Sequence, residues 1–185
     1  WYNNHAISIS GPYGLGGGVY LERPSVGDPG DTANIRFENV LFHHNTASNG
    51  GGAIAVGNGP ISLFSMHLIN ATLSQNLPDG FYIDGERVQV WNSIVWNNGA
   101  APFSGAVSPT ILYSIVNGIT EVDGNKAQDP LFQSPTSNFH LSQGSPAIDM
   151  GENSFSTEST DLDGLPRIMR TIIDIGAYEN LLYCF

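Results

Sequence analysis

The sequence predicts an all-β protein, a parallel β-helix (solenoid) with an irregular C-terminal cap. Glycine (22) and proline (11) are frequent among the 185 residues and charged residues make up only 12%, so turns are dense and helix-favouring residues are scarce. Apolar and polar residues alternate over short segments, as in strands with one buried face. The same pattern recurs along the chain, which is the mark of a repeat architecture. These observations exclude a helical bundle.

The repeated segment is eleven residues long and contains two asparagines at fixed positions. Its first half reads apolar, any residue, apolar, any residue, Asn. Three copies occupy residues 35–45, 66–76 and 88–98, and a weaker fourth copy begins at Ile111, with Tyr113 in place of the first Asn. The steps between the equivalent positions 39, 70, 92 and 113 are 31, 22 and 21 residues. Each copy predicts strands.

A second element, a glycine followed by a short apolar strand, recurs between these copies. It occupies residues 18–20, 52–54, 80–82 and 105–107. Clusters of Gly, Asn and Pro separate the elements, and their Gly and Asn residues supply the positive φ that tight corners need. We therefore expect each repeat to hold two or three short strands, and the coils to span residues 1–125.

A parallel solenoid explains this repeat better than an antiparallel sandwich does. In a solenoid each strand pairs with its counterpart one coil away, at about 4.8 Å. A sandwich would also contain short strands, but it would not place the same Asn at the same phase of every unit. We therefore predict that Asn39, Asn70 and Asn92 form a structural ladder, stacked with their side chains hydrogen-bonded along the axis.

The N-terminal end of the predicted solenoid has no element to cover its first coil. Residues 1–10 resemble a strand, and no helical pattern precedes them to cover the first coil. An open solenoid end exposes unpaired strand edges, which favour association. The sequence therefore predicts either a stacking partner at this end or missing upstream coils.

The C-terminal part of the chain contains a series of short motifs. They are DPLF at 129–132, GSPAIDMG at 144–151, DLDGLPR at 161–167 and DIGAYE at 174–179. In order and spacing, and together with NSIVWNN at 92–98, they resemble the C-terminal signature of the choice-of-anchor Q domain. The resemblance covers roughly residues 88–179. Upstream, FHHN at 42–45 followed by GGAI at 51–54 is similar to the repeat of polymorphic outer-membrane proteins.

These resemblances imply a right-handed parallel β-helix from a bacterial protein that is secreted or attached to the cell surface. They imply a non-catalytic domain that serves adhesion, display or binding of a glycan or a protein. The chain departs from the choice-of-anchor pattern after Glu179, because the six residues that follow contain no sorting signal. The mode of attachment therefore stays open.

Residues 126–185 are expected to form the cap of the same domain, as a lid over the last coil. Ser145, Pro146 and Gly151 suit the beginning and end of a short helical turn. Arg167 lies in sequence among several aspartates, including Asp149 and Asp174. We predict that these three charged residues are the hub of the cap, with Arg167 pairing in bidentate fashion with one of the carboxylates.

Two pairs of residues are candidates for binding a metal ion. Asp161 and Asp163 alternate beside a glycine turn, a pattern that suits Ca²⁺, although a turn with Asx hydrogen bonds explains the same residues. His43 and His44 are adjacent, so on a strand they point to opposite faces and would bind one metal only if the chain bends between them. The sequence therefore requires no cofactor and leaves Ca²⁺ open.

The alternative function is a polysaccharide-active β-helix, a lyase or glycoside hydrolase, or a fragment of one. Such an enzyme needs paired carboxylates, and Asp84 and Glu86 are weak candidates because they lie around a turn. Trp91 and Trp96 would stack on sugars if they point outward. If these four residues share one outer face, the enzyme is favoured, and if they scatter, it is not.

Charge and hydropathy exclude other classes of partner. The net charge is −11 with only six basic residues, so the chain has no basic patch that would bind nucleic acid. No apolar run is long enough to span a membrane. Cys184 is the single cysteine and cannot form an internal disulfide.

Overall fold

The computed structural model describes residues 4–6, 14–21, 33–57, 64–85 and 87–181. Sixteen strands follow one another along these residues. Their bounds are β1 His5–Ala6, β2 Val19–Leu21, β3 Ala33–Glu38, β4 Leu41–His43, β5 Thr46–Ala47, β6 Ile54–Val56, β7 Phe64–Ile69, β8 Thr72–Ser74, β9 Asp79–Ile83, β10 Arg87–Trp91, β11 Ile94–Trp96, β12 Ala101–Gly105, β13 Thr110–Leu112, β14 Ile115–Val116, β15 Phe132–Ser134 and β16 Asn138–Leu141. A 3-10 helix, η1, spans Asn153–Phe155, and no α-helix occurs in the described part of the chain. The protein is all-β, as the sequence predicts.

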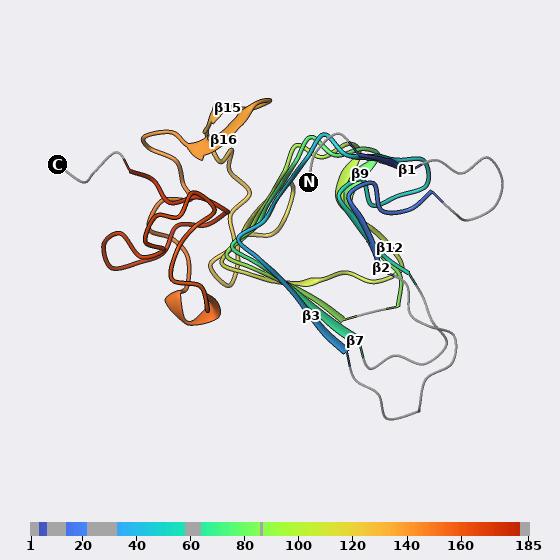
Figure 1. Cartoon of the computed structure of the whole chain (residues 1–185), viewed down its shortest axis with the longest axis horizontal. Coiled ribbons are helices and arrows are strands. Elements are labelled where there is room, and N and C mark those ends of the chain that lie inside the picture. Colours follow the sequence, from blue (N-terminus) through green and yellow to red (C-terminus); the bar gives the residue numbers. More distant parts are fainter. Residues whose placement is uncertain (1–3, 7–13, 22–32, 58–63, 86, 182–185) are drawn as a thin grey trace.

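Twelve strands form three four-stranded sheets: the first sheet (β13-β10-β7-β3), the second sheet (β14-β11-β8-β4) and the third sheet (β12-β9-β6-β2). Every neighbouring pair within them is parallel. Along the chain the strands visit the first, second and third sheets in a repeating order. In Figure 1 the strands of each sheet overlie one another along one side of a three-sided outline. Each strand therefore pairs with the equivalent strand of the next copy.

The register of the first sheet agrees with the repeat found in the sequence. Phe37 pairs with Leu68, and Leu68 pairs with Val90. The residue in the first Asn position has a positive φ in all four copies: 51° at Asn39, 47° at Asn70, 46° at Asn92 and 48° at Tyr113. Asn is one of the few residues that adopt this left-handed conformation readily. The repeated Asn therefore marks the corner where the chain passes from the first sheet to the second.

The fourth glycine element lies elsewhere than predicted. Phe103 pairs with Phe81, so the fourth strand of the third sheet is Ala101–Gly105, and residues 106–107 follow it as exposed chain. Gly105 has a φ of +98°, and an added Cβ there would lie 2.1 Å from the carbonyl oxygen of Ile83. This glycine therefore ends a strand, whereas the sequence motif treats it as the beginning of one.

The main core lies between the three sheets. Alternate side chains of each strand point inward, as the two-residue period requires. The buried residues that fill the core are Phe42, Leu73, Val95 and Val116 from the second sheet, Met66, Leu68, Val88 and Val90 from the first, and Ile54, Val56, Phe81 and Ile83 from the third. A second core covers the outer face of the second sheet, where Ile94 and Ile115 pack against Phe139, Ile175 and other apolar residues of the C-terminal segment.

The C-terminal segment, residues 128–181, is not a lid over the last copy. Figure 1 shows it, in orange and red, beside the corner between the first and second sheets. The last strands are covered by the chain that directly follows them, because Lys126 forms backbone hydrogen bonds with Ser114 and Val116, and Ile119 packs against the main core. The predicted lid therefore corresponds to a short connection, and the longer segment runs along the side of the sheets.

At the N-terminal end, β1 pairs in parallel with β5 through His5 and Thr46. Most of the segment predicted as a first strand lies outside the described residues, and the stacking partner or upstream coil stays a prediction. Among the described residues, no helix is long and apolar enough to cross a membrane.

Candidate functional site

The outer face of the first sheet carries a row of polar side chains at one register position. Arg36 on β3 pairs with His67 on β7, which pairs with Gln89 on β10, which pairs with Thr110 on β13. Their neighbours in each strand point into the core, so all four side chains lie on the outer face. The row crosses the four strands at about 4.8 Å per step. We call these residues the polar row.

Three polar atoms on this face are buried without a hydrogen-bond partner. They are Nδ1 of His67, Oε1 of Gln89 and Nε1 of Trp91. Buried polar atoms are nearly always paired in native proteins, because an unpaired one costs about 1–3 kcal/mol. Burial, and secondarily the charge of Arg36, lowers the pKa of His67. A neutral imidazole in this position offers one donor and one acceptor to a bound molecule.

Aromatic rings border the polar row at the end of the strands. Trp91 stacks on Phe155 of η1, with ring centroids 4.5 Å apart, and its edge meets His67 at 5.1 Å. Tyr113 meets Phe155 edge to face at 5.9 Å. Trp91, Tyr113 and Phe155 are all half-buried. Flat apolar rings beside directional polar groups are suited to a ligand that has both apolar faces and hydroxyl groups.

Both carboxylate oxygens of Glu38, at this end of β3, accept hydrogen bonds. Arg36 Nε donates to its Oε2 at 2.7 Å, and Thr157 donates to it from both its backbone N–H and its hydroxyl, each at 2.8 Å. Burial opposes ionisation, but the hydrogen bonds from Arg36, Thr157 and Ser156 outweigh it and lower the pKa of Glu38 to about 2. Glu38 is therefore ionised at neutral pH, and it positions the C-terminal segment instead of acting as an acid.

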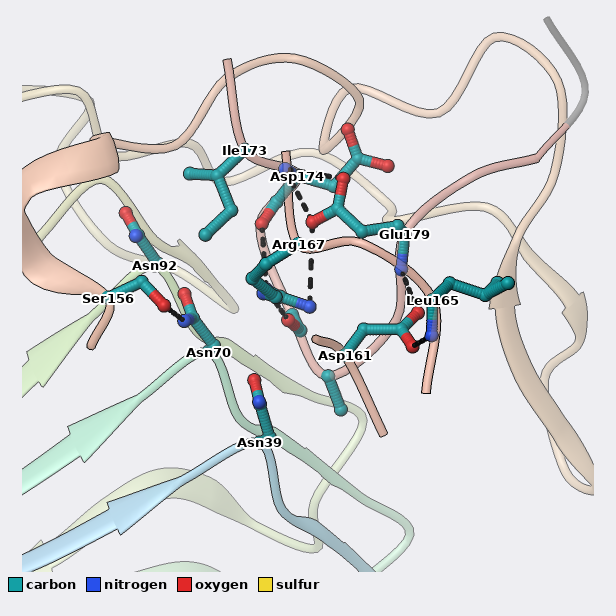
Figure 2. Close-up of polar contacts among 12 residues, drawn as sticks. Asn39, Asn70, Asn92, Ser156, Asp161, Leu165, Arg167, Ile173, Asp174 and Glu179 are labelled. Atoms are coloured by element: carbon teal, nitrogen blue, oxygen red, sulfur yellow. Dashed lines mark hydrogen bonds and ion pairs between the residues drawn. The ribbon is translucent and has the colours of Figure 1, made fainter. Parts of the chain in front are cut away.

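The three asparagines of the first corner lie in a row, as predicted, but their amide groups do not bond to one another (Figure 2). They donate to the C-terminal segment: Asn39 to the Thr160 carbonyl at 2.6 Å, Asn70 to the Ser156 hydroxyl at 2.9 Å and Asn92 to the Glu152 carbonyl at 2.9 Å. The acceptors follow at intervals of four residues and run opposite to the order of the copies. The predicted ladder is therefore corrected: its members are docking points for a strap, residues 152–160.

The second asparagine of each copy forms the side-chain ladder instead. Nδ2 of Asn45 donates to Oδ1 of Asn76 at 3.0 Å, and Nδ2 of Asn76 donates to Oδ1 of Asn98 at 2.8 Å. The same oxygens also accept the backbone N–H of the Asn one copy earlier: Oδ1 of Asn76 accepts from Asn45 at 3.1 Å, and Oδ1 of Asn98 accepts from Asn76 at 3.0 Å. Asn4 extends the series by donating to Asn45. All three repeat residues are buried.

Arg167 is buried in the C-terminal segment, but its carboxylate partner differs from the predicted ones. Its Nη1 lies 3.5 Å from Glu179, and its Nη2 donates to the carbonyl of Gly176 at 2.6 Å (Figure 2). Burial, and next the charge of Asp174, raises the pKa of Glu179 to about 8 despite Arg167. Asp149 pairs with Arg170 at 2.7 Å. Arg167 therefore lies among acidic residues, as predicted, but its carboxylate partner is Glu179, whereas Asp149 pairs with a different arginine.

Asp174 holds backbone groups, not the guanidinium. Its carboxylate accepts the N–H of Asp149 and of Asn180, each at 2.7 Å. Only its backbone carbonyl meets Arg167, at 3.3 Å. Burial raises the pKa of Asp174, although these hydrogen bonds oppose the effect. The sequence could not tell whether Asp174 accepts backbone N–H groups or pairs with Arg167, because an aspartate near an arginine in sequence is consistent with both.

Asp161 and Asp163 form a turn. Oδ1 of Asp161 accepts the N–H of Asp163 at 2.9 Å and of Leu165 at 2.8 Å, and its Oδ2 accepts the N–H of Glu179 at 2.9 Å. Asp163 pairs with His140 at 2.7 Å. Both oxygens of Asp161 are thus committed to backbone groups, which fits the Asx turn better than Ca²⁺. The described residues contain no group of three or more His, Cys, Asp or Glu side chains placed to hold a metal ion.

The residues expected in an enzymatic groove do not share one face. Trp91 lies on the first sheet, Trp96 on the second, and Asp84 in the bend that follows β9 of the third. Asp84 hydrogen-bonds Tyr82, and burial, followed by the charge of Asp84, raises the pKa of that phenol. Glu86 lies outside the described residues. The polar row was missed from the sequence because its signal is a register between strands, visible only once the copies are paired.

Comparison with models of known protein families, with curated proteins and with solved structures finds no match to this chain.

Proposed function

We propose that this chain is a non-catalytic, right-handed parallel β-helix domain that binds carbohydrate on the outer face of its first sheet. We further propose that it belongs to a secreted or surface-displayed bacterial protein of the choice-of-anchor Q type, where it serves adhesion or display. The repeating order of three parallel sheets supports the solenoid. The motifs of residues 129–179 support the bacterial surface context.

The observation that carries carbohydrate binding is the set of unpartnered polar atoms beside aromatic rings. His67 and Gln89 are neighbours in the polar row, and the third atom belongs to Trp91. Sugars present hydroxyl groups at their edges and C–H groups on their faces, so they would satisfy the polar atoms and pack against the rings. Glu38, the carboxylate at the end of β3 beside Arg36, has its pKa lowered to about 2 and is unsuited to protonating a leaving group.

A glycan array screened with and without calcium tests this proposal. The full chain should bind at least one polysaccharide, and Gln89→Ala should weaken that binding by about tenfold, the value of one hydrogen bond to a buried polar group. Gln133→Ala, a change of the same type at an exposed position on β15, should leave it unchanged. Equal loss in both variants, or no glycan bound, would contradict the proposal.

The same experiment distinguishes the alternative. Any bound polysaccharide should be recovered intact after incubation, as judged by the absence of new reducing ends or unsaturated products. Release of such products, lost on Asp84→Asn, would establish the polysaccharide-active enzyme instead.

A further inference from the structure

The side chains of His43 and His44 meet at the end of β4. Their Nδ1 atoms lie 2.9 Å apart, and the ring planes are inclined at 84°. Both residues are half-buried. Adjacent residues on a strand point to opposite faces, so this convergence needs a break in the backbone.

The break is the left-handed conformation of His44, with a φ of 55°. The same conformation occurs in the next two copies, at Gln75 (60°) and Asn97 (56°), so it belongs to the repeat. The corner therefore turns the side chain of His44 back toward that of His43. From the sequence we expect the two rings to bind one metal only if the chain bends between them, and this bend is present.

A further polar group lies on the neighbouring strand. His43 pairs in register with Ser74, whose hydroxyl oxygen is buried and has no hydrogen-bond partner. On the other side, the ring of His43 packs against Phe139 of the C-terminal segment, with centroids 5.0 Å apart. The histidine pair thus lies beside an orphaned oxygen and an aromatic wall that restricts the motion of one ring.

We propose that His43 and His44 bind one divalent transition metal of tetragonal geometry, Cu²⁺ in preference to Ni²⁺, through their two Nδ1 atoms. Imidazole nitrogens bind such metals at about 2.0–2.1 Å, and two ligands at a right angle are then about 2.9 Å apart, whereas tetrahedral zinc would need about 3.3–3.4 Å. Water fills the remaining positions, and Ser74 supplies a hydrogen bond to it.

The metal takes the place of a proton. Without metal, one ring donates its Nδ1–H to the Nδ1 of the other. On binding, the donor ring gives up this proton and takes one from solvent at Nε2, so both neutral rings present a lone pair to the metal and no net proton is released. The proposal is independent of carbohydrate binding, because the pair lies on the second sheet and the polar row on the first.

The test is titration of the full chain, freed of any affinity tag, with Cu²⁺ alone, followed by calorimetry and electron paramagnetic resonance. We expect one Cu²⁺ per chain and hyperfine structure from two nitrogen atoms. His44→Asn and His43→Ser copy the residues that the repeat itself uses, Asn97 and Ser74, and preserve the fold. Each should weaken binding by about tenfold or more, because even the loss of a partner that only orients a ligand costs about 10–100-fold in metal affinity.

His140→Asn is the matched control, because His140 is also half-buried but its ring contacts Tyr178 and Asp163 instead of the histidine pair. It should leave Cu²⁺ affinity and the spectrum unchanged. Near-ultraviolet circular dichroism verifies that each variant is folded. Absence of Cu²⁺ binding to the wild-type chain, or binding as tight in His43→Ser and His44→Asn as in the wild type, would overturn the proposal and leave a simple hydrogen bond between the rings.

Discussion

The two asparagine corners of the repeat use the same residue type in opposite ways. At the second corner, Asn45, Asn76 and Asn98 are buried and bond to one another from copy to copy. At the first corner, Asn70 and its equivalents take a positive φ and donate to the strap, residues 152–160. The second corner thus stabilises the stack from within, whereas the first joins the stack to a separate segment.

The difference shows that a residue repeated at a fixed phase predicts where a corner lies more reliably than it predicts which group its side chain bonds to. Both corners give the same sequence signal, an Asn at a fixed phase. The side chain of the second corner faces the core, where only the next copy offers polar groups. That of the first corner faces outward, where the strap offers Ser156 and nearby carbonyls. Three predictions test how the stack and the C-terminal segment that it holds differ.

The largest effect is expected at the middle of the inner ladder. Asn76→Ala removes bonds to Asn45, Asn98 and the Phe42 carbonyl and leaves buried groups unpaired, which should lower the free energy of unfolding by about 3 kcal/mol. Asn70→Gly is the matched change at the outer corner. It keeps the positive φ without strain and should cost only about 1 kcal/mol. Equal costs in urea denaturation would refute the distinction between the corners.

A local effect of similar size is expected inside the C-terminal segment. Arg167→Met removes the guanidinium that donates to the buried carbonyls of Gly176 and Asp174 and lies 3.5 Å from Glu179, which should destabilise this segment by about 3 kcal/mol. Hydrogen exchange should then accelerate at the amides of Ile173 and Ile175, while that of Asn76 in the inner ladder stays protected. Uniform acceleration would show that the segment and the stack unfold as one unit.

The smallest effect concerns pH at the outer corner. Folding lowers the pKa of Glu38 from 4.5 to about 2, so its contribution to stability is complete above about pH 4.5 and is lost as the pH falls toward 2. Wild-type protein should therefore lose more stability over this window than Glu38→Gln does. Parallel profiles of the melting temperature for the two proteins would contradict this assignment.

Much of the fold could be predicted from local patterns. Alternation and the spacing of the copies predicted the strands of the first and second sheets, and the repeated Asn predicted a bend. The structure shows that this bend has a left-handed backbone, even where Tyr113 replaces Asn. Gly105 was misplaced, because glycine signals a corner without telling whether a strand begins or ends there. The candidate site was not predicted, because the polar row requires knowing which residues of different copies are in register.

The amino-acid sequence by itself determined the strands, their repeat and the positions that need a left-handed backbone, since these depend on side-chain period and on local steric limits. Only the tertiary structure decided that Arg167 faces Glu179, that His43 meets His44, and that the outer asparagines hold the strap. The physical reason is that a polar side chain bonds to whatever group the fold brings within about 3 Å, and that distance depends on segments far apart in the chain.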